Sequence, residues 1–206
     1  MVYNIGDLRS FNTFIGLLAG RVAQMLNMTA LASLVGVSVN TIKSWISVLE
    51  ASNIVFLLQP FHVNSSKRII RTPKLFFYDN GLAARLNGIT TRQEIINSPL
   101  LGPLFENYII SETLKYYSNR GKPVRLNFFR SHSGMEIDLL IEEKSRITPV
   151  EIKASASFGN FKDFNYKLLT EYTGRDIGEG FLVYLGGEKL KLSRNITALS
   201  SFEYLS

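Results

Sequence analysis

The chain has 206 residues, of which 46% are hydrophobic and 19% charged, a composition that supports one large or two small globular domains and excludes a disordered tail. It has no cysteine and only two histidines, which excludes a disulfide framework and a zinc site built on Cys and His. Since we find no signal peptide and no apolar run long enough to cross a bilayer, we expect a cytoplasmic protein with no membrane partner.

The net charge of +6 is unevenly distributed along the chain. Residues 1–98 contain 9 basic and 4 acidic side chains, whereas residues 99–206 contain 14 and 13. The N-terminal half is therefore the candidate for contact with an anionic partner such as DNA. An ordinary solvated surface with a modest basic excess explains the same counts, and charge alone does not separate the two explanations.

A long apolar-periodic stretch runs from about Phe11 to Leu26 and predicts the start of a three-helix core. The following segment, TALASLVGVSVNTIKSWISVLEASNIV at residues 29–55, predicts two further helices separated by a tight turn that contains Gly36. A short helix, a turn with glycine and a longer helix form the plan of a helix-turn-helix.

The second helix of this pair is predicted to leave one small, polar and mildly basic face. Ser38 is placed to cap the helix, and Ile42, Ile46 and Leu49 then point together into the core. The outer face carries Asn40, Lys43, Ser44 and Ser47. Such a face suits insertion into the major groove of DNA. Any three-helix core leaves a similar face, so a merely solvated helix is the alternative.

Two strand-like segments follow, IVFLLQPF at residues 54–61 and RIIRTPKLFFY at residues 68–78, and they predict a β-hairpin. A hairpin in this place is the wing of a winged helix. The basic residues on or near it are Lys67, Arg68, Arg71 and Lys74. We expect them to hold DNA phosphates, and the alternative is that they keep an apolar hairpin from aggregating.

The segment rich in Gly, Pro and Ser around residue 98 predicts a boundary between a winged-helix DNA-binding-like domain, residues 1–98, and a second domain, residues 99–206. Pro103 is favoured at the first position of the next helix, which carries Glu106 on its apolar stripe. Strands at RLNFFR and in two charged segments follow, then a helix in FGNFKDFNYKLLTEY and a strand in GFLVYLGG. This order predicts an α/β (α+β) layer with one mixed sheet.

The two charged segments lie in MEIDLLIEEKSRITPVEIKAS, residues 135–155. A hairpin that is symmetric about Lys144 and Ser145 sets Asp138 opposite Glu151, at a separation of roughly 5 Å. Two like charges at that distance repel each other, so the pair needs a shared proton or a bound cation. Oxygen ligands suit Mg²⁺ or Mn²⁺, with the Ile152 carbonyl as a third ligand. The alternative is a purely structural role, in which Lys153 pairs with Glu136 and the two carboxylates are solvated at the edge of the sheet.

The order Glu106, Asp138 and Glu151-Ile152-Lys153 resembles the core of the PD-(D/E)XK (restriction-endonuclease-like) nuclease superfamily. Nearly the whole chain also resembles the C-terminal region of a prokaryotic AAA-type ATPase family, in which a winged helix precedes a nuclease-like domain of unknown function. The stretches that carry this resemblance are LASLVGVSVNTIKSWISVLEASNIV, PKLFFYDNGLAARL, GPLFENYIISE, FFRSHSGMEIDLLIE and PVEIKAS.

The resemblance implies a metal-dependent phosphodiesterase site. Its catalytic residues would be Glu106, Asp138, Glu151 and Lys153, and its Mg or Mn ligands would be Asp138, Glu151 and the Ile152 carbonyl. The family carries its ATPase domain upstream, and this chain has no phosphate-binding loop, so ATP would enter only through that absent part of a longer protein. The alternatives are a non-catalytic module that delivers the ATPase to DNA or to a protein, and a small transcriptional regulator.

Overall fold

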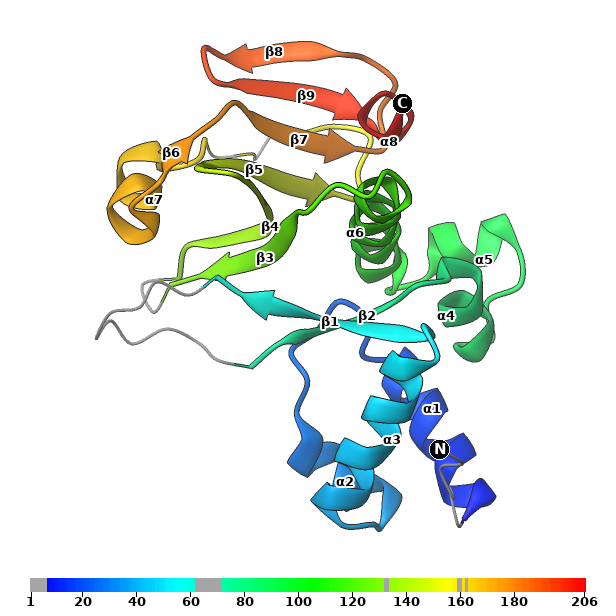
Figure 1. Cartoon of the computed structure of the whole chain (residues 1–206). Coiled ribbons are helices and arrows are strands. Elements are labelled where there is room, and N and C mark those ends of the chain that lie inside the picture. The colour runs from blue at the N-terminus through cyan, green and yellow to red at the C-terminus, as the bar shows by residue number, and fades with distance from the viewer. Residues whose placement is uncertain (1–6, 62–71, 132–133, 159–160, 162) are drawn as a thin grey trace. The chain divides into compact units, whose positions relative to one another are not determined.

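The computed structural model describes residues 7–61, 72–131, 134–158, 161 and 163–206. The chain divides into two compact units, the first comprising Met1–Leu57 and Thr72–Ser111 and the second comprising Leu58–Arg71 and Glu112–Ser206. Helices and strands are mixed along the chain, and both parallel and antiparallel strand pairs occur (Figure 1). The predicted α/β class with a mixed sheet is therefore confirmed, and the domain boundary near residue 98 stays a prediction.

The first unit begins with three helices, α1 (Leu8–Ala19), α2 (Met28–Val35) and α3 (Val39–Ala51). The Ser38 side chain accepts the Thr41 N–H at the start of α3, so the predicted cap is confirmed. Gly36 ends α2 with a φ of 80°, a left-handed conformation that costs glycine little.

The apolar stretch from Phe11 to Leu26 is helical only in its first part. Helix α1 ends at Ala19, and turns follow it, in which the Ala23 N–H donates to the Leu75 carbonyl at 2.8 Å. Side chains are buried in both parts of the stretch. Apolar periodicity therefore did not reveal where the helix gives way to pairing with a strand.

In the described part of the chain, no single helix is both long enough and apolar enough to cross a membrane. Helices α2 and α3 reach that length and hydropathy only as a pair, and they are bent by 107° at the break between them. Trp45 of α3 is 4% exposed within the core of the first unit, where its ring lies 5.3 Å from that of Phe14.

Strands β1 (Val55–Pro60) and β2 (Lys74–Phe77) are neighbours and correspond to the predicted hairpin, whose connection lies outside the described residues. The helices α4 (Asn80–Leu86), α5 (Arg92–Asn97) and α6 (Leu101–Asn119) follow. Helix α6 begins two residues before Pro103, which is tolerated in a first turn because N–H groups there have no intrahelical acceptor. The Asn107 side chain ties α6 to β2, since it accepts the Phe77 N–H at 2.7 Å and donates to the Phe77 carbonyl at 3.2 Å.

The second unit is built on a mixed sheet in the order β1-β3-β4-β5-β7-β9-β8, to which the end of β1 contributes and in which β6 pairs with β5. Its strands are β3 (Arg125–Arg130), β4 (Glu136–Glu143), β5 (Arg146–Lys153), β6 (Asp176–Ile177), β7 (Gly180–Tyr184), β8 (Leu190–Ser193) and β9 (Ile196–Ser200). Its short helices are α7 (Tyr166–Thr173) and α8 (Ser201–Leu205). The predicted strands β3, β4, β5 and β7 are confirmed, whereas β6, β8, β9 and α8 had not been predicted.

Helix α7 begins at Tyr166, where Asn165 caps it, and not at Phe158 as predicted. Phe158 and Phe164 instead pack into apolar clusters beside the sheet. The phenylalanines before Asn165 are spaced like residues on one side of a helix, but α7 begins only after them. Strands β8 and β9 were missed for different reasons. Strand β8 has only four residues, half of them polar, whereas β9 is buried through most of its length but has only five residues.

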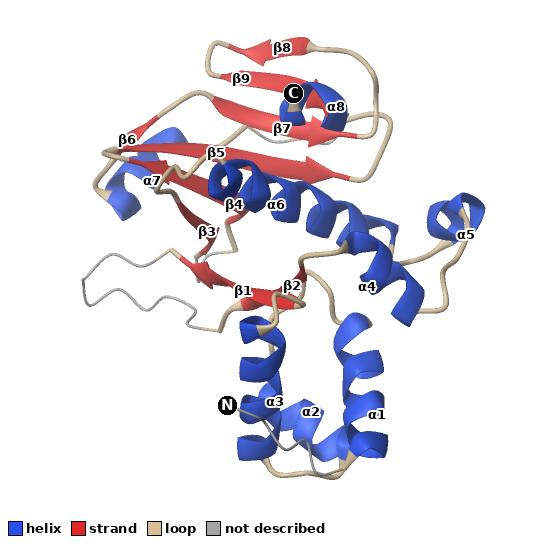
Figure 2. Cartoon of the chain, turned by 45° about the vertical axis from the view of Figure 1, so that its right-hand side comes forward, coloured by secondary structure: helices blue, strands red, loops and turns tan. Residues whose placement is uncertain are grey.

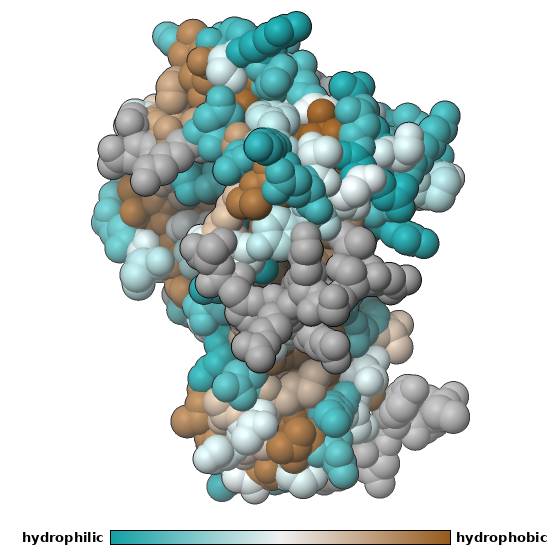
Figure 3. Space-filling view, turned by 90° about the vertical axis from the view of Figure 1, so that its left-hand side faces the viewer, coloured by the Kyte–Doolittle hydropathy of each residue, from teal (hydrophilic) through white to brown (hydrophobic). Residues whose placement is uncertain are grey.

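The helices of the second unit cover both faces of its sheet (Figure 2). Tyr204 of α8 contacts Phe181 of β7 and also bonds Thr113 of α6, so both helices lie on the face to which Phe181 points. Leu169 of α7 packs with Ile147 of β5 on the other face. On the side drawn in Figure 3, hydrophilic side chains are interspersed with small apolar patches, which is ordinary for a protein surface.

Candidate functional site

The hairpin of β4 and β5 has the symmetric register that the sequence predicted. Its regular ladder runs from a two-residue turn to Leu139, which lies opposite Val150. In the turn, Lys144 has a φ of 54°, the left-handed conformation that such tight hairpins require. The next residue on each strand is a carboxylate, Asp138 on β4 and Glu151 on β5, so the register brings the two predicted ligands to the same level of the hairpin.

Strand β4 carries one extra residue beside Asp138. On the side where β4 pairs with β3, Asn127 lies opposite Leu140 but Phe129 lies opposite Ile137. Two steps along β3 therefore match three steps along β4, which defines a β-bulge. As a result Ile137 and Leu140 share one core cluster, although strict alternation had placed them on opposite faces. Bulges of this kind redirect side chains next to functional sites.

The Asp138 carboxylate is anchored to the opposite strand. Its Oδ2 accepts the Ile152 N–H at 2.8 Å. Ile152 is the middle residue of the Glu-x-Lys segment, so this bond joins Asp138 directly to the backbone between Glu151 and Lys153. The Asp138 side chain thus fixes the position of strand β5, which carries the other two predicted ligands, Glu151 and Ile152.

Glu151 lies in a strongly perturbed electrostatic environment. Its side chain is only 16% exposed, and its Oε1 lies 2.5 Å from the ammonium nitrogen of Lys153, which is 44% exposed. Burial raises the pKa of Glu151, the charge of Asp138 raises it further, and Lys153 opposes both, with a resulting pKa of about 7. Glu136 adds a weaker effect that also raises it. A carboxyl group that exchanges its proton near neutral pH is typical of functional sites.

A pocket of about 480 Å³ opens beside this group. It is lined by Glu136, Glu151 and Lys153, and its wall includes Phe161 and Phe164. The two rings meet edge to face at 79°, with their centroids 5.7 Å apart. The pocket therefore joins carboxylates and an ammonium group to an aromatic wall, which is the usual character of a small ligand site.

No three acidic or histidine side chains converge as a ready-made metal site anywhere in the described ranges. Asp138 and Glu151 supply two carboxylates at one level of the hairpin, and a carboxylate can accept an amide and bind a cation at once because it has several lone-pair directions. An ion held there would need a backbone oxygen, such as the predicted Ile152 carbonyl, and water. Mg²⁺ commonly keeps several waters, so the residues present fit such an ion.

Glu106 belongs to the first unit, whereas Asp138, Glu151 and Lys153 belong to the second. Its Oε1 lies 3.0 Å from the ammonium nitrogen of Lys74, and these side chains are 18% and 6% exposed respectively. Lys74 is therefore not on the solvent-facing surface where we expected it to bind phosphate. The reason is that every residue of β2 is buried, and a buried ammonium group requires a paired carboxylate.

The predicted DNA-contacting residues of α3 are all exposed, namely Asn40, Lys43, Ser44 and Ser47. The Ser47 hydroxyl donates to the backbone carbonyl of Lys43 at 3.0 Å, one turn earlier on the helix. The basic residues predicted for the hairpin, Lys67, Arg68 and Arg71, lie outside the described residues. Their role in DNA binding stays a prediction.

Two family models match the chain. One, described as "Domain of unknown function (DUF8612)", matches residues 1–93, and the other, described as "Domain of unknown function (DUF4143)", matches residues 101–204, which is more than half of the chain. The chain belongs to the DUF4143 family. Neither description assigns a fold or an activity. The nuclease-like function that the resemblance implies is therefore a proposal.

This DUF4143 chain is also similar to two longer curated proteins. They are "Uncharacterized protein Mb2031c" of Mycobacterium bovis and "Uncharacterized protein Rv2008c" of Mycobacterium tuberculosis, and each is 25% identical to it over 190 residues. The alignment covers 92% of this chain but only 41% of each relative. The chain thus spans about two fifths of the length of the curated relatives that it matches.

Several contributors to the DUF4143 site were missed by sequence reasoning. Glu136 had been considered only as a partner for Lys153, yet its charge also acts on Glu151. The aromatic wall of Phe161 and Phe164 had been assigned to a helix. Its sequence signal was the repetition of phenylalanine at every third position in FGNFKDF. Phe161 and Phe164 of this repeat meet edge to face before α7 begins.

Proposed function

We propose that the second unit of this DUF4143 protein is a PD-(D/E)XK-like phosphodiesterase domain that acts on DNA and depends on Mg²⁺ or Mn²⁺. The main observation in support is the hairpin geometry, in which Asp138, anchored on the Ile152 amide, stands at the level of Glu151 with Lys153 beside it. The adjoining pocket has room for a phosphate group and the nucleotide atoms bonded to it. The order of these residues is also that of the nuclease superfamily.

The residues of the hairpin have separate roles in this proposal. Asp138 and Glu151 hold the cation, because hard divalent ions prefer carboxylate oxygens. Such an ion would stabilise negative charge on the phosphate and lower the pKa of a water molecule. Lys153 places a positive charge at the mouth of the pocket, where charge develops on the phosphate oxygens. Glu106 pairs with Lys74 within the first unit, and the catalytic role that the resemblance gives it stays a prediction.

For the first unit we propose a winged helix that binds duplex DNA through α3 with little sequence preference. The support is the exposed outer face of α3, whose side chains are small, polar or basic. Such side chains donate to phosphate oxygens, and the proposal is that these contacts, which carry no sequence information, predominate. The greater length of the mycobacterial relatives supports the further proposal that this chain acts beside an ATPase domain of a longer protein.

A second candidate function is a non-catalytic module that delivers such an ATPase to DNA or to a partner protein. One observation favours it. The Lys153 ammonium group lies 2.5 Å from Glu151 and already supplies a positive charge at the place assigned to the metal. In that case the carboxylates and Lys153 form a structural network within a nuclease-like fold.

Cleavage of labelled DNA by the purified chain separates the two candidates. Single-stranded and duplex oligonucleotides should be cut with Mg²⁺ or Mn²⁺ and left intact with a chelator. Lys153→Ala should reduce the rate at least about hundredfold, because it removes a charge that acts in the transition state. The matched control is Lys167→Ala, an exposed lysine of α7 that should leave the rate unchanged. Cleavage that survives Lys153→Ala, or no cleavage with either metal, would reject the nuclease proposal.

A further inference from the structure

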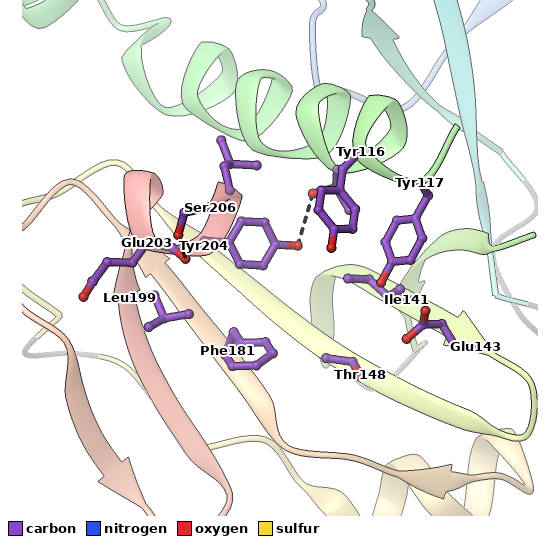
Figure 4. A pocket seen from close by; sticks show the side chains of 12 residues that line it. Tyr116, Tyr117, Ile141, Glu143, Thr148, Phe181, Leu199, Glu203, Tyr204 and Ser206 are labelled. Atoms are coloured by element: carbon purple, nitrogen blue, oxygen red, sulfur yellow. Dashed lines mark hydrogen bonds between the residues drawn. The ribbon is translucent and has the colours of Figure 1, made fainter. Parts of the chain in front are cut away.

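A second pocket lies on the other face of the sheet in the second unit, between the last turns of α6, the strands and α8 (Figure 4). Its volume is about 350 Å³, within the range of small-molecule sites. Thr148 lines it from β5, and alternation along this strand directs Glu151 to the opposite face. The pocket is therefore separate from the proposed metal site.

Four of the twelve residues that line the pocket are aromatic. Tyr116 and Tyr117 come from α6, Phe181 from β7 and Tyr204 from α8 (Figure 4). The rings of Tyr116 and Tyr117 meet edge to face with centroids 5.2 Å apart, and those of Phe181 and Tyr204 do so at 6.3 Å. In such edge-to-face pairs one ring turns its edge to the face of the other, so part of the aromatic surface stays open to the pocket.

Two carboxylates stand at opposite ends of the pocket, Glu143 beside Tyr117 and Glu203 at α8 (Figure 4). Glu203 caps α8 through Oε2, which accepts the N–H and the hydroxyl of Ser200, and no described residue bonds its Oε1. None of the twelve lining residues is Lys, Arg or His, although the protein carries a net charge of +6. The pocket is thus an acidic site in a basic protein.

The surroundings show that these rings already attract cations. The Arg120 guanidinium lies 3.7 Å from the centroid of the Tyr116 ring, in a cation–π contact. Burial raises the pKa of Tyr117, and the charge of Glu143 helps to raise it to about 12. The face of Tyr116 thus holds one cation, and Glu143 places a negative charge beside Tyr117.

We propose that the pocket binds a linear aliphatic diamine, with one ammonium group at Glu143, the other at Glu203, and the methylene chain over the rings of Phe181 and Tyr204. The two separated carboxylates favour a ligand with two positive ends over one with a single charge. The aromatic faces favour alkylammonium groups through cation–π attraction. An anionic ligand such as a nucleotide would meet two carboxylates and no basic side chain in the lining.

Isothermal titration of the 206-residue protein with cadaverine, in the presence of a chelator, tests this proposal. Cadaverine should bind, pentylamine should bind more weakly, and pentanol and pentanoate should give no measurable heat. Glu143→Gln and Glu203→Gln should each weaken cadaverine binding about tenfold, the effect expected for a charge-assisted hydrogen bond. Glutamine at position 203 retains a capping oxygen, so α8 should persist.

Two further variants make the result specific to the pocket. Phe181→Leu keeps the apolar contact but removes a ring, and it should weaken cadaverine binding without affecting the fold. Glu171→Gln, which removes the same charge from the exposed surface of α7, should change nothing. Equal binding of pentanol and cadaverine, or equal weakening by Glu171→Gln, would overturn the proposal. So would binding that Glu151→Gln abolishes and Glu143→Gln leaves intact, because the diamine would then occupy the other pocket.

Discussion

Replacement of Glu151 by glutamine should change how the stability of the second unit depends on pH. In the folded protein, burial and Asp138 raise the pKa of Glu151 from 4.5 to about 7. Between these values the unfolded chain releases the proton and the folded chain retains it, so the free energy of unfolding falls as the pH rises. Each pH unit in this window costs about 1.4 kcal/mol.

The full effect is a loss of about 3 kcal/mol between pH 4.5 and pH 7, because the window spans the difference between 4.5 and about 7. The stabilisation is complete below pH 4.5 and is gone above pH 7. Glutamine does not titrate, so Glu151→Gln should lack this loss. Relative to the wild type, the variant should therefore gain stability as the pH rises through the window.

Urea unfolding at several pH values, in the presence of a chelator, measures this difference. The single tryptophan, Trp45, belongs to the first unit, so its fluorescence follows that unit alone. Near-ultraviolet dichroism reports both units, and most tyrosines belong to the second, so the part of its change that tryptophan fluorescence does not share follows the second unit. Glu171→Gln, on the exposed surface, is the control and should keep the wild-type slope. A constant difference between wild type and Glu151→Gln from pH 4.5 to 7.5 would show that Asp138 and burial do not act on Glu151 as inferred.

Three other predictions concern the remaining parts of the chain. Lys74→Met should destabilise the first unit by about 3 kcal/mol in unfolding followed by Trp45 fluorescence, because it removes the ammonium group that pairs with the buried Glu106 carboxylate. The double variant with Glu106→Leu should recover most of this loss, and failure to recover would mean that packing dominates. Lys43→Ala should weaken binding to duplex DNA of any sequence and reduce the slope of log affinity against log salt by about one, whereas an unchanged slope would remove Lys43 from the interface. The purified chain should not hydrolyse ATP, since it lacks a phosphate-binding loop, and turnover that a mutation within the chain abolishes would contradict this.

Local signals allowed the helix pair of the first unit and the charged hairpin of the second to be predicted. Ser38 capped its helix as expected, and the symmetric turn set the register that places Asp138 beside Glu151. These features depend on residues close together in sequence, where periodicity and turn chemistry are informative.

Features that depend on tertiary contacts were not predictable in this way. The buried pair of Lys74 and Glu106 joins residues 32 positions apart, and Lys74 was therefore mistaken for a surface residue. The bulge beside Asp138 arises from pairing with β3, which the alternation within β4 does not reveal. Helix α8 begins with the pattern Ser200-x-x-Glu203, a capping box that sequence reasoning overlooked. Its aromatic pocket depends on packing of Tyr204 against α6 and β7, which no short motif indicates.

The central claim is that Asp138 and Glu151 together bind a divalent cation. Titration of the isotope-labelled protein with Mn²⁺, observed through its backbone amide signals, tests this claim most directly, because a bound paramagnetic ion broadens the nearest signals. We predict saturable broadening centred on the amides of residues 138 and 151–153, reproduced as a rise in melting temperature with Mg²⁺. Asp138→Asn keeps an oxygen that can accept the Ile152 N–H, so it should fold normally and lose both effects. Broadening centred elsewhere, or broadening unchanged in Asp138→Asn, would contradict the claim.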